Sequence, residues 1–414
     1  MSDFGQTFDV AVAGAGPAGV AAALALAHIG ARVALVGPEP SKADTSRPET
    51  RTAALLTSSV DFLKRLDVWD ALQPHAAPLR MIRIVDDSKS IVRSPDTAFD
   101  ASELGLDAFG YNVANTKLLA ALYACAQTVL PAVLSTTVTG IEIDAREARL
   151  ALGDGTAITA QLVAGADGRR SVARAAAEIE TKEWRYDQGA IATSFRHAER
   201  HDGVSTEVHR EHGSVTTVPT PDPHTSSLIW VGTTAEIKTL MDCDDVAFAR
   251  ELQNRLGDAL GRVSDIGARA QFPVAGLSAE RLARNRTALI GEAAHILPPI
   301  GAQGLNLGLR DAAALADCVA DARRRGQDPG GQAVLSAYVR ARELDVLSRT
   351  VGVDLLNRSL LSGLVPVQAA RGLIMHGLNA LPSLRRMVMR VGLAPPVDLP
   401  SLMRPPRREP HVNA

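Results

Sequence analysis

Residues 8–36 read FDVAVAGAGPAGVAAALALAHIGARVALV and contain a strand, a glycine turn, a helix and a second strand. We expect the strands at Phe8–Ala13 and Arg32–Val36 and the helix at Ala18–Ile29. The first strand is almost entirely apolar, as a strand that is covered on both faces must be. This βαβ unit predicts an α/β fold with a doubly wound sheet.

The turn of this unit has the pattern G-x-G-x-x-G, formed by Gly14, Ala15, Gly16, Pro17, Ala18 and Gly19. The first glycine allows the tight turn, the second lets a pyrophosphate approach the backbone, and the third lets the helix pack on the sheet. The helix N-terminus adds free N–H groups and a positive dipole. The turn therefore predicts a dinucleotide site. The acid that usually binds the ribose is replaced by Gly37, which leaves Glu39 or backbone contacts as alternatives.

The rest of the chain divides into α/β sections and an antiparallel β insert. We expect helices at 50–72, at 116–130 and from about residue 305, and strands at 135–144, 148–152 and 162–164. Residues 186–273 alternate between polar and apolar side chains, with proline-rich turns, which is typical of half-exposed antiparallel sheet. We predict a nucleotide domain at 1–80, 105–185 and 275–350, a β-rich substrate domain at 81–104 and 186–274, and C-terminal helices and a tail at 351–414.

Composition excludes several classes of protein. The net charge of −2 over 414 residues gives no basic footprint for nucleic acid. The three cysteines, Cys125, Cys243 and Cys318, form no C-x-x-C pair, which argues against a disulfide reductase and indicates a reducing compartment. We find no signal-peptide pattern and no uninterrupted apolar stretch of about 18 residues. We therefore expect a cytoplasmic protein, with peripheral contact to the inner face of the membrane as an open question.

Two further motifs follow short predicted strands. Residues 165–174 read GADGRRSVAR, and residues 291–308 read GEAAHILPPIGAQGLNLG. A nicotinamide site would need neither, whereas an extended FAD continues well beyond its pyrophosphate. Together with the glycine turn, these motifs resemble the group A flavoprotein monooxygenases, which have the p-hydroxybenzoate hydroxylase fold. Residues 51–55, 110–115 and 299–311, and Tyr338 with Arg342 and Asp345, resemble the ubiquinone-biosynthesis hydroxylases within that group.

The resemblance implies a fold and a set of FAD contacts. The fold is a glutathione-reductase-like Rossmann variant that binds FAD, with an inserted antiparallel substrate domain and a C-terminal helical segment. Arg51 would contact the flavin, the backbone of Val138 the adenine side, and Glu292, where the family usually has Asp, the ribityl or ribose hydroxyls. The Pro299 carbonyl would face the substrate pocket near the flavin. The remaining implied cofactor contacts are Asn115, Asp167, Gly168, Gly301, Ala302, Gln303, Gly304, Leu305 and Asn306.

The resemblance also implies a reaction. NAD(P)H would reduce FAD, oxygen would form a flavin C4a-hydroperoxide, and this species would hydroxylate the ring of a phenolic, polyprenylated ubiquinone precursor. A second G-x-G-x-x-G is missing from the sequence, so the nicotinamide would bind transiently as a co-substrate. Two alternatives stay open, which are a hydroxylase of a small soluble aromatic acid and a non-catalytic flavoprotein scaffold. Partners would include other quinone-biosynthesis proteins.

Several polar residues have less specific interpretations. His295 follows an apolar strand, so we expect a structural hydrogen bond rather than catalysis. Asp167 has a helix cap as its alternative role. The histidines of the β insert match no common zinc pattern, so we expect no metal site; they are His197, His201, His209 and His212.

The last sixty residues contain a basic amphipathic stretch. Apolar residues recur at helical spacing at Ile374, Leu378, Leu381, Leu384, Val388 and Val391, and positive charge comes from Arg371, Arg385, Arg386 and Arg390. Such a helix can lie on a membrane surface and meet a polyprenyl substrate. Packing on the domain, or on a second copy in a homo-oligomer, is the alternative.

Overall fold

The first sheet contains the βαβ unit that the sequence predicts. The computed structural model describes residues 7–40, 50–87, 95–210, 212–299, 301–361, 365–393 and 398–405, without the side chains of 360–371. The parallel strands of the first sheet stand in the order β19-β11-β1-β2-β8. They are β1 (Thr7–Ala13), β2 (Val33–Val36), β8 (Ala132–Leu134), β11 (Ala157–Gly165) and β19 (Thr287–Leu289). The short β18 (Ala283–Arg284) pairs antiparallel with β19, and the hairpin of β9 (Val138–Ile143) and β10 (Ala148–Leu152) pairs with β11.

Both faces of this sheet are covered, which explains the apolar strands. Val10 and Val12 pack in a core with the helices α1 (Pro17–His28), α4 (Asn115–Val129) and α8 (Gln303–Arg324). Ala11 and Ala13 face the other side, where they pack with β9, β10 and the short helix α5 (Val172–Ala176). The period of two along β1 therefore divides its residues between two cores.

The carboxyl ends of four parallel strands meet at one edge of the sheet. Ala13 lies beside Val36 and Gly165, and Gly165 lies beside Leu289. The glycine turn and the two later motifs follow these strand ends, so they emerge together. This edge is where open α/β sheets bind their ligands.

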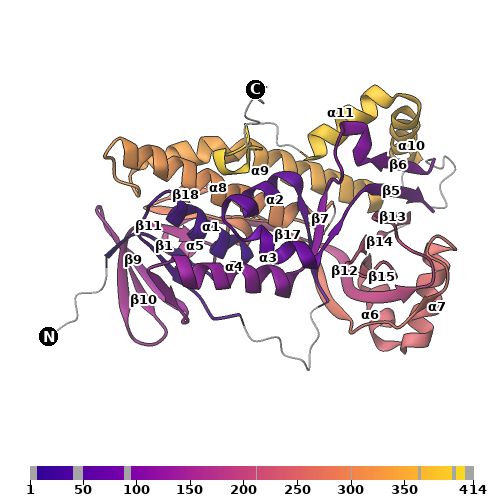
Figure 1. Ribbon diagram of the computed structural model, residues 1–414, viewed down its shortest axis with the longest axis horizontal. Helices are drawn as coiled ribbons and strands as arrows, with labels where there is room; N and C mark the ends of the chain where they lie inside the picture. Colours follow the sequence, from indigo (N-terminus) through magenta and orange to yellow (C-terminus); the bar gives the residue numbers. More distant parts are fainter. Residues whose placement is uncertain are drawn as a thin grey trace, which may run out of the picture.

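The second sheet is mostly antiparallel, as the alternation in 186–273 predicts, and it lies beside the first along the long axis (Figure 1). Its order is β20-β17-β12-β15-β14-β13-β5-β6, with β16 beside β12, and β13 and β5 run parallel. The strands are β5 (Met81–Asp86), β6 (Thr97–Asp100), β12 (Thr181–His197), β13 (Val204–Arg210), β14 (Gly213–Pro219), β15 (Thr225–Thr233), β16 (Val263–Ser264), β17 (Ala270–Ala279) and β20 (His295–Ile296). Helices α6 (Thr234–Asp242) and α7 (Asp245–Leu256) cover one face.

A small third sheet corrects one prediction. Residues 50–72 are not helical throughout, because Thr52–Leu56 forms β3, which pairs with β7 (Gly110–Ala114). The β4 strand (Ala76–Pro78) pairs with the other edge of β7. Helices follow only at α2 (Thr57–Arg65), α3 (Trp69–Leu72) and η1 (Gln73–His75). The hydrogen bonds of β3 come from a strand about sixty residues away, which local periodicity does not register.

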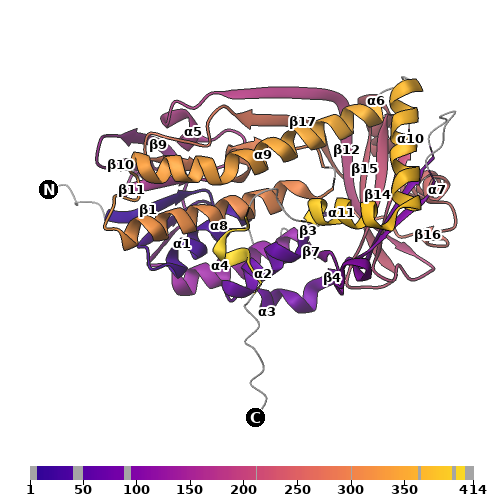
Figure 2. The ribbon, with the colours of Figure 1, turned by 90° about the horizontal axis from the view of Figure 1, so that it is seen from above.

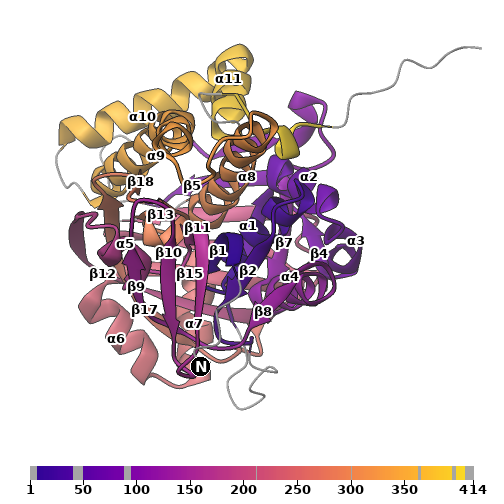
Figure 3. The ribbon, with the colours of Figure 1, turned by 90° about the vertical axis from the view of Figure 1, so that its left-hand side faces the viewer.

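Long helices join the two sheets on one side of the molecule. The α9 helix (Gln332–Leu361) has 30 residues, or about 45 Å, and runs beside α8 along both sheets (Figure 2). The amphipathic stretch forms two helices, α10 (Val365–Ala380) and α11 (Pro382–Leu393), on the side opposite α6 and α7 (Figure 3). Short 3-10 turns complete the elements at η2 (Ala101–Leu104), η3 (Gly291–Ala293) and η4 (Ser401–Met403). Within the described parts of the chain, no helix combines the length and apolar character needed to cross a bilayer.

Candidate active site

A cavity of about 890 Å³ lies at the edge where the strand ends converge. This volume is in the range of cofactor and ligand sites in proteins. Its lining comes from all three motifs and from β3 and α4. Among the predicted cofactor residues, those that line it are Gly16, Pro17, Ala18, Gly19, Arg51, Asn115, Gly168, Glu292, Ala302, Gly304 and Leu305.

The three glycines of the turn have different surroundings. A Cβ on Gly14 would lie 2.2 Å from the Ala166 carbonyl oxygen, and one on Gly19 would lie 2.0 Å from the Gly14 oxygen. Gly14 also has a φ of +113°, which L side chains rarely adopt. By contrast, a Cβ on Gly16 would have no atom within 4 Å. Gly14 and Gly19 are therefore required by the fold, whereas Gly16 leaves room in the cavity. Ala15 is buried behind the turn.

The missing ribose acid has a steric cause. A Cβ on Gly37 would lie 2.4 Å from the backbone nitrogen of Ala15. A carboxylate side chain at this position would need the glycine turn to move. Pro40 lines the cavity nearby, whereas Glu39 is not among the described residues that do.

Three helices begin at the cavity without a side-chain cap among the described residues. Their N-cap residues are Gly16 for α1, Ala114 for α4 and Ala302 for α8, and no acidic residue stands in their first turns. Ala302 has a φ of +52°, which is uncommon for a residue with a side chain. Uncapped helix N-termini carry free N–H groups and partial positive charge. The cavity therefore favours a ligand with phosphates and electron-rich ring atoms.

The Asp167 side chain supports the start of α5, whose N-cap residue is Ser171. Its carboxylate accepts hydrogen bonds from the Ser171 hydroxyl and from the Ala173 N–H at 3.0 Å, at the start of α5. The neighbouring Gly168, with a φ of +78°, lines the cavity. Arg174 connects this motif to the next one, because its Nη1 donates to the Ala293 carbonyl at 2.8 Å. These contacts support the helix-cap alternative for the Asp167 side chain and leave the adjacent backbone at the cavity.

The third motif contributes both side chains and backbone to the region of the cavity. Glu292 is exposed and lines the cavity, so its carboxylate is available to hydroxyl groups. Gly301, with a φ of +65°, starts the turn into α8, and Gln303 Oε1 is buried without a hydrogen-bond partner among the described residues. Pro299 is exposed just before this turn, outside the described lining.

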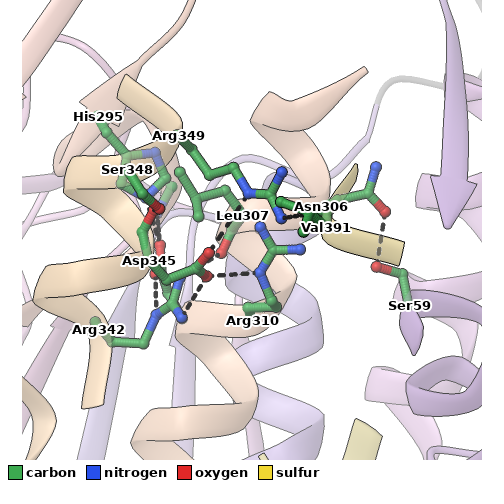
Figure 4. Close-up of polar contacts among 12 residues, drawn as sticks. Ser59, His295, Asn306, Leu307, Arg310, Arg342, Asp345, Ser348, Arg349 and Val391 are labelled. Carbon is green, nitrogen blue, oxygen red and sulfur yellow. Dashed lines mark hydrogen bonds and ion pairs between the residues drawn. The ribbon is translucent and has the colours of Figure 1, made fainter. Parts of the chain in front are cut away.

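Asn306 is fully buried and holds the start of α8 in place. Its Oδ1 accepts from the Leu56 N–H at 2.9 Å and the Ser59 hydroxyl at 2.7 Å, and its Nδ2 donates to the carbonyls of Ala54 and Ala302. Figure 4 shows the contact with Ser59. The side chain is therefore committed to the protein, and it positions the α8 N-terminus.

Arg51, Asn115 and Val138 have different positions. Arg51 is exposed at the cavity. Asn115, in the first turn of α4, has an Oδ1 that is buried without a hydrogen-bond partner among the described residues, as expected of a group that meets a ligand. Val138 instead begins β9 and packs against the core on the far face of the first sheet. It is not among the described residues that line the cavity.

A buried network of charges behind the cavity was not predicted. His295 Nε2 lies 2.7 Å from Asp311 Oδ2, and Asp311 Oδ1 accepts from Arg342 Nε at 2.7 Å. Asp345 Oδ2 accepts from Arg342 Nη1 and from Arg310 Nε (Figure 4). The predicted structural hydrogen bond of His295 is thus present. The resemblance did single out Tyr338, Arg342 and Asp345. The contacts of Arg342 and Asp345 with residues of α8 could not be predicted from the sequence, because they arise from the packing of α9 against α8.

The charges in this network control its protonation. Burial would raise the pKa of Asp311, but His295, Arg342 and the Gly291 N–H hold it well below the usual range of a carboxyl. Burial lowers the pKa of Arg310, whereas Asp311 and Asp345 overcome burial and raise that of Arg342. Burial also raises the pKa of Tyr338, which donates to the Leu289 carbonyl at 2.6 Å. Asp311 is therefore an anion and Tyr338 is neutral at pH 7.

Other lining residues come from one face of α4, which the motifs do not cover. Thr116, Ala120, Tyr123 and Gln127 recur every three or four residues, and Lys117 lies beside the first of them. The only signal in the sequence was this helical spacing after Asn115.

The cavity fits a large dinucleotide better than a metal. It offers a glycine turn with open space at Gly16, helix N-termini without a side-chain cap, an exposed carboxylate at Glu292, and at Asn115 a buried acceptor without a partner in the described part of the chain. These groups match phosphates, a polyol chain and a heterocycle. Within the described ranges, no group of three or more His, Cys, Asp or Glu residues could hold a metal ion.

Comparison with known proteins gives consistent results. A family model described as FAD binding domain matches residues 7–349. The chain is 32% identical to ubiquinone hydroxylase UbiL of Rhodospirillum rubrum, over 92% of this chain and 88% of the relative. It is also 32% identical to 3-demethoxyubiquinol 3-hydroxylase of Escherichia coli, over 94% and 99%. The solved structure of p-nitrophenol 4-monooxygenase PnpA from Pseudomonas putida is similar in fold, with a TM-score of 0.74 at 20% identity, over 95% of this chain and 100% of that one.

Proposed function

This chain belongs to the FAD binding domain family, and from that premise we propose that it hydroxylates the aromatic ring of a polyprenylated ubiquinone precursor. It is an FAD-dependent monooxygenase that uses NAD(P)H and oxygen. The observation that supports the proposal most is the meeting of three motifs, 14–19, 165–168 and 291–306, around one cavity. Two relatives at 32% identity over nearly the whole chain are named ubiquinone hydroxylase and 3-demethoxyubiquinol 3-hydroxylase.

The proposal assigns a role to each part of the cavity. The N–H groups at the start of α1, beside the space at Gly16, would bind the pyrophosphate. Glu292 would bind hydroxyls of the ribityl or ribose units, and Arg51 and Asn115 would approach from β3 and α4. The backbone of 301–305 would donate to the pyrimidine end of the flavin. Backbone N–H groups there would stabilise negative charge on the ring.

When bound, FAD supplies hydride acceptance from the nicotinamide and activation of oxygen. The protein then has to hold the phenol beside the flavin and keep water away. Pro299, exposed next to the α8 turn, would line the path between flavin and substrate. No side chain is assigned as a general base.

We place the substrate against the face of the second sheet opposite α6 and α7. Ala190, Val231 and Val274 are buried there, with Ile229 and Phe272 partly buried. The β17 strand connects this face to the cavity, since Leu277 pairs with Ile296 of its lining. An apolar wall suits an aromatic ring with a hydrocarbon chain.

The division of the chain into domains follows the same proposal. The first sheet with its helices would be the doubly wound, glutathione-reductase-like unit, built from 1–80, 105–185 and 275–350. The second sheet would be the substrate domain, built from 81–104 and 186–274, and residues 351–414 would be the C-terminal part.

We further propose that the surface of α9, α10 and α11 contacts an anionic membrane surface, where a polyprenyl substrate would be found. Among the described residues, every exposed large hydrophobic side chain except Val129 and Val246 lies on these helices or, for Leu381, at the link between α10 and α11. Residues 365–393 contain four arginines and no acidic residue. Exposed apolar side chains next to positive charge match the interface of a bilayer with anionic lipids.

The predicted amphipathic stretch contributes both inward and outward contacts. Leu378 is buried, and Leu384 is partly buried, against β6 and η2. The remaining four members, Ile374, Leu381, Val388 and Val391, are exposed. Arg385 forms a bidentate pair with Glu103 at 2.9–3.0 Å, which fixes α11 to the body. Packing on the domain therefore accounts for only part of the stretch, and the side chain of Arg371 lies outside the described residues.

Flotation tests this surface. The protein should float with vesicles containing phosphatidylglycerol and remain behind with pure phosphatidylcholine. Leu373→Asp with Ile374→Asp should abolish flotation, whereas Val246→Asp, on α7, should not. Loss of a dimer in the double variant, without an effect on flotation, would instead assign the surface to a second copy of the chain.

The enzymatic proposal is tested by reconstitution. The purified holoprotein should consume NADPH or NADH and incorporate one atom of ¹⁸O₂ into a prenylated phenol, as detected by mass spectrometry. A deletion strain should accumulate a precursor that lacks one hydroxyl. Turnover of small aromatic acids alone would support the soluble-substrate alternative. FAD binding without turnover of any phenol would support the scaffold alternative.

A further inference from the structure

His295 differs from two other buried histidines, His197 and His201, in its hydrogen bonds. In His197 and His201, both ring nitrogens bond to neighbouring protein groups. His295 is equally buried, at 2% exposure, but only its Nε2 is bonded. Its Nδ1 is buried without a hydrogen-bond partner among the described residues. Buried polar atoms of this kind are rare in native proteins and often have a functional explanation.

The position of His295 indicates what this nitrogen meets. His295 lines the cavity three residues after Glu292, which also lines it. Gly291, just before Glu292, packs against Ala18 of the first motif and Gly308 of α8. His295 therefore shares a cavity wall with the junction of the first and third motifs, and the Nε2 edge of its ring faces Asp311 on α8.

Asp311 determines which atom of the ring carries hydrogen. It is an anion held by Arg342 and the Gly291 N–H as well as by His295. A carboxylate can only accept, so Nε2 must carry the hydrogen. In the neutral ring, Nδ1 then has a lone pair and acts as an acceptor. The network fixes both the tautomer and the orientation of the ring, as carboxylate–histidine pairs do at metal sites.

We propose that His295 is a cofactor-binding residue whose Nδ1 accepts a hydrogen bond from a hydroxyl of the ribityl chain of FAD, with Asp311 as its positioning residue. This inference rests on the binding of FAD in the cavity. Its ligand class is a polyol, because Nδ1 needs a donor and the neighbouring Glu292 carboxylate also accepts from hydroxyls. The structural hydrogen bond to Asp311 and the ligand contact are therefore two functions of one ring.

Two substitutions separate these functions. The amide of glutamine reaches the place of Nε2, so His295→Gln keeps a donor for Asp311 and loses the group at Nδ1. The amide of asparagine reaches the place of Nδ1, so His295→Asn keeps a polar group toward the cavity and leaves Asp311 without this donor. His201→Gln serves as a control, because that histidine bonds to backbone groups of the β insert.

The experiment measures the thermal stability of each apoprotein and its Kd for FAD and for ADP, which lacks the ribityl chain. His295→Gln should leave the melting temperature of the apoprotein and the Kd for ADP unchanged. Its Kd for FAD should rise about tenfold, because roughly one hydrogen bond is lost. His295→Asn should melt earlier but bind FAD more tightly than His295→Gln. His201→Gln should bind FAD like the wild type.

A different pattern would overturn the inference. If His295→Gln bound FAD within twofold of the wild type, Nδ1 would not contact the cofactor. If FAD affinity followed melting temperature across both variants, the dyad would be structural only. Should one variant fail to fold, the FAD-to-ADP affinity ratio of the other still decides, because a purely structural role leaves that ratio unchanged. Failure of the wild-type protein to bind FAD would instead reject the proposed function.

Discussion

Single residues at the glycine turn have separable roles in folding and in binding. Gly14 and Gly19 are in contact with backbone that a side chain would strike, whereas the space beside Gly16 is open. The sequence motif groups these glycines together, but their different surroundings predict different effects of substitution at each position. Substitution of Gly19 affects the fold first, and substitution of Gly16 affects the ligand first.

Gly16→Val should yield a folded protein without FAD. The added side chain would fill the space that we assign to the pyrophosphate, while meeting no protein atom at its Cβ. We expect a colourless purified protein with a weakening of FAD affinity of at least about 100-fold, from the loss of charge-assisted hydrogen bonds of roughly 1.5–3 kcal/mol each. Gly140→Val, in β9 with equally open surroundings, is the control and should stay yellow. A yellow Gly16→Val protein would contradict the phosphate placement.

Asp311 gives the fold a pH dependence on the acidic side. Its pKa is lower in the folded protein than the ordinary value, which is about 3.9 in an unfolded chain. A group with a depressed folded pKa contributes stability above the unfolded pKa, and this contribution is lost as the pH falls through the folded pKa. The Asp311 contribution is thus complete at pH 7 and decreases below about pH 4.

Asp311→Asn should reduce the free energy of unfolding at pH 7 by about 3–5 kcal/mol, because it leaves Arg342 in the interior without one of its carboxylates. Urea denaturation at pH 7, 5, 4 and 3 should show the gap to the wild type shrinking toward low pH. Asp154→Asn, which removes an exposed turn carboxylate with a lowered pKa, should change stability much less. A gap that stays constant across this range would refute the assignment.

At the scale of elements, the start of α8 is placed by a side chain rather than by a cap. Asn306 connects this helix to β3 and to α2 through three hydrogen bonds, and a fourth goes to Ala302 at the N-cap of α8. The β3 strand in turn depends on β7. The orientation of the α8 N-terminus toward the cavity is therefore a property of three elements together.

Asn306→Ala should lower the free energy of unfolding by about 2–4 kcal/mol. Buried donors and acceptors lose their hydrogen-bond partner at a cost of about 1–3 kcal/mol each, and local relaxation recovers part of this cost. The holoprotein should also bind FAD more weakly and show an altered flavin absorption spectrum. Denaturation of the apoprotein and a FAD titration measure the two effects. Asn379→Ala, which removes one exposed hydrogen bond to Asp96, should change neither. A stable variant with an unchanged spectrum would rule out this role.

At the scale of the whole molecule, the cavity exists only where distant segments meet. Residues 16–19, 51–54, 115–127, 166–168 and 290–308 all contribute to its lining. A ligand that binds this folded arrangement, and not the unfolded chain, stabilises the protein by mass action.

FAD at 100 times its Kd should raise the free energy of unfolding of the apoprotein by about 2.7 kcal/mol. Differential scanning calorimetry with increasing FAD measures the effect, and the melting temperature should rise with the logarithm of the FAD concentration. Gly16→Val should show no rise. An equal rise in that variant would mean that FAD stabilises the protein from another site.

Much of the fold was predictable because it depends on local patterns. The βαβ unit, the helices at 116–130 and from about residue 305, and the antiparallel insert follow from apolar periodicity and turn residues. The segment 52–56 was assigned wrongly, since its strand pairing comes from 110–114. The Asp167 side chain was expected foremost in a cofactor motif, and its hydrogen bonds to Ser171 and Ala173 depend on the exact start of α5.

The sequence by itself determined the dinucleotide-binding unit, because a glycine turn between an apolar strand and a helix depends on short-range physics, and the order of its three motifs carried the resemblance to flavoprotein monooxygenases. Tertiary structure decided which groups line the cavity. The Asp167 carboxylate bonds to Ser171 and Ala173 because of the exact backbone turn at the start of α5. The His295 ring is held by Asp311, which α8 brings beside it. The contacts of His295 form only once α8 and α9 have packed together beside the first sheet, because Asp311 comes from α8 and its partner Arg342 from α9.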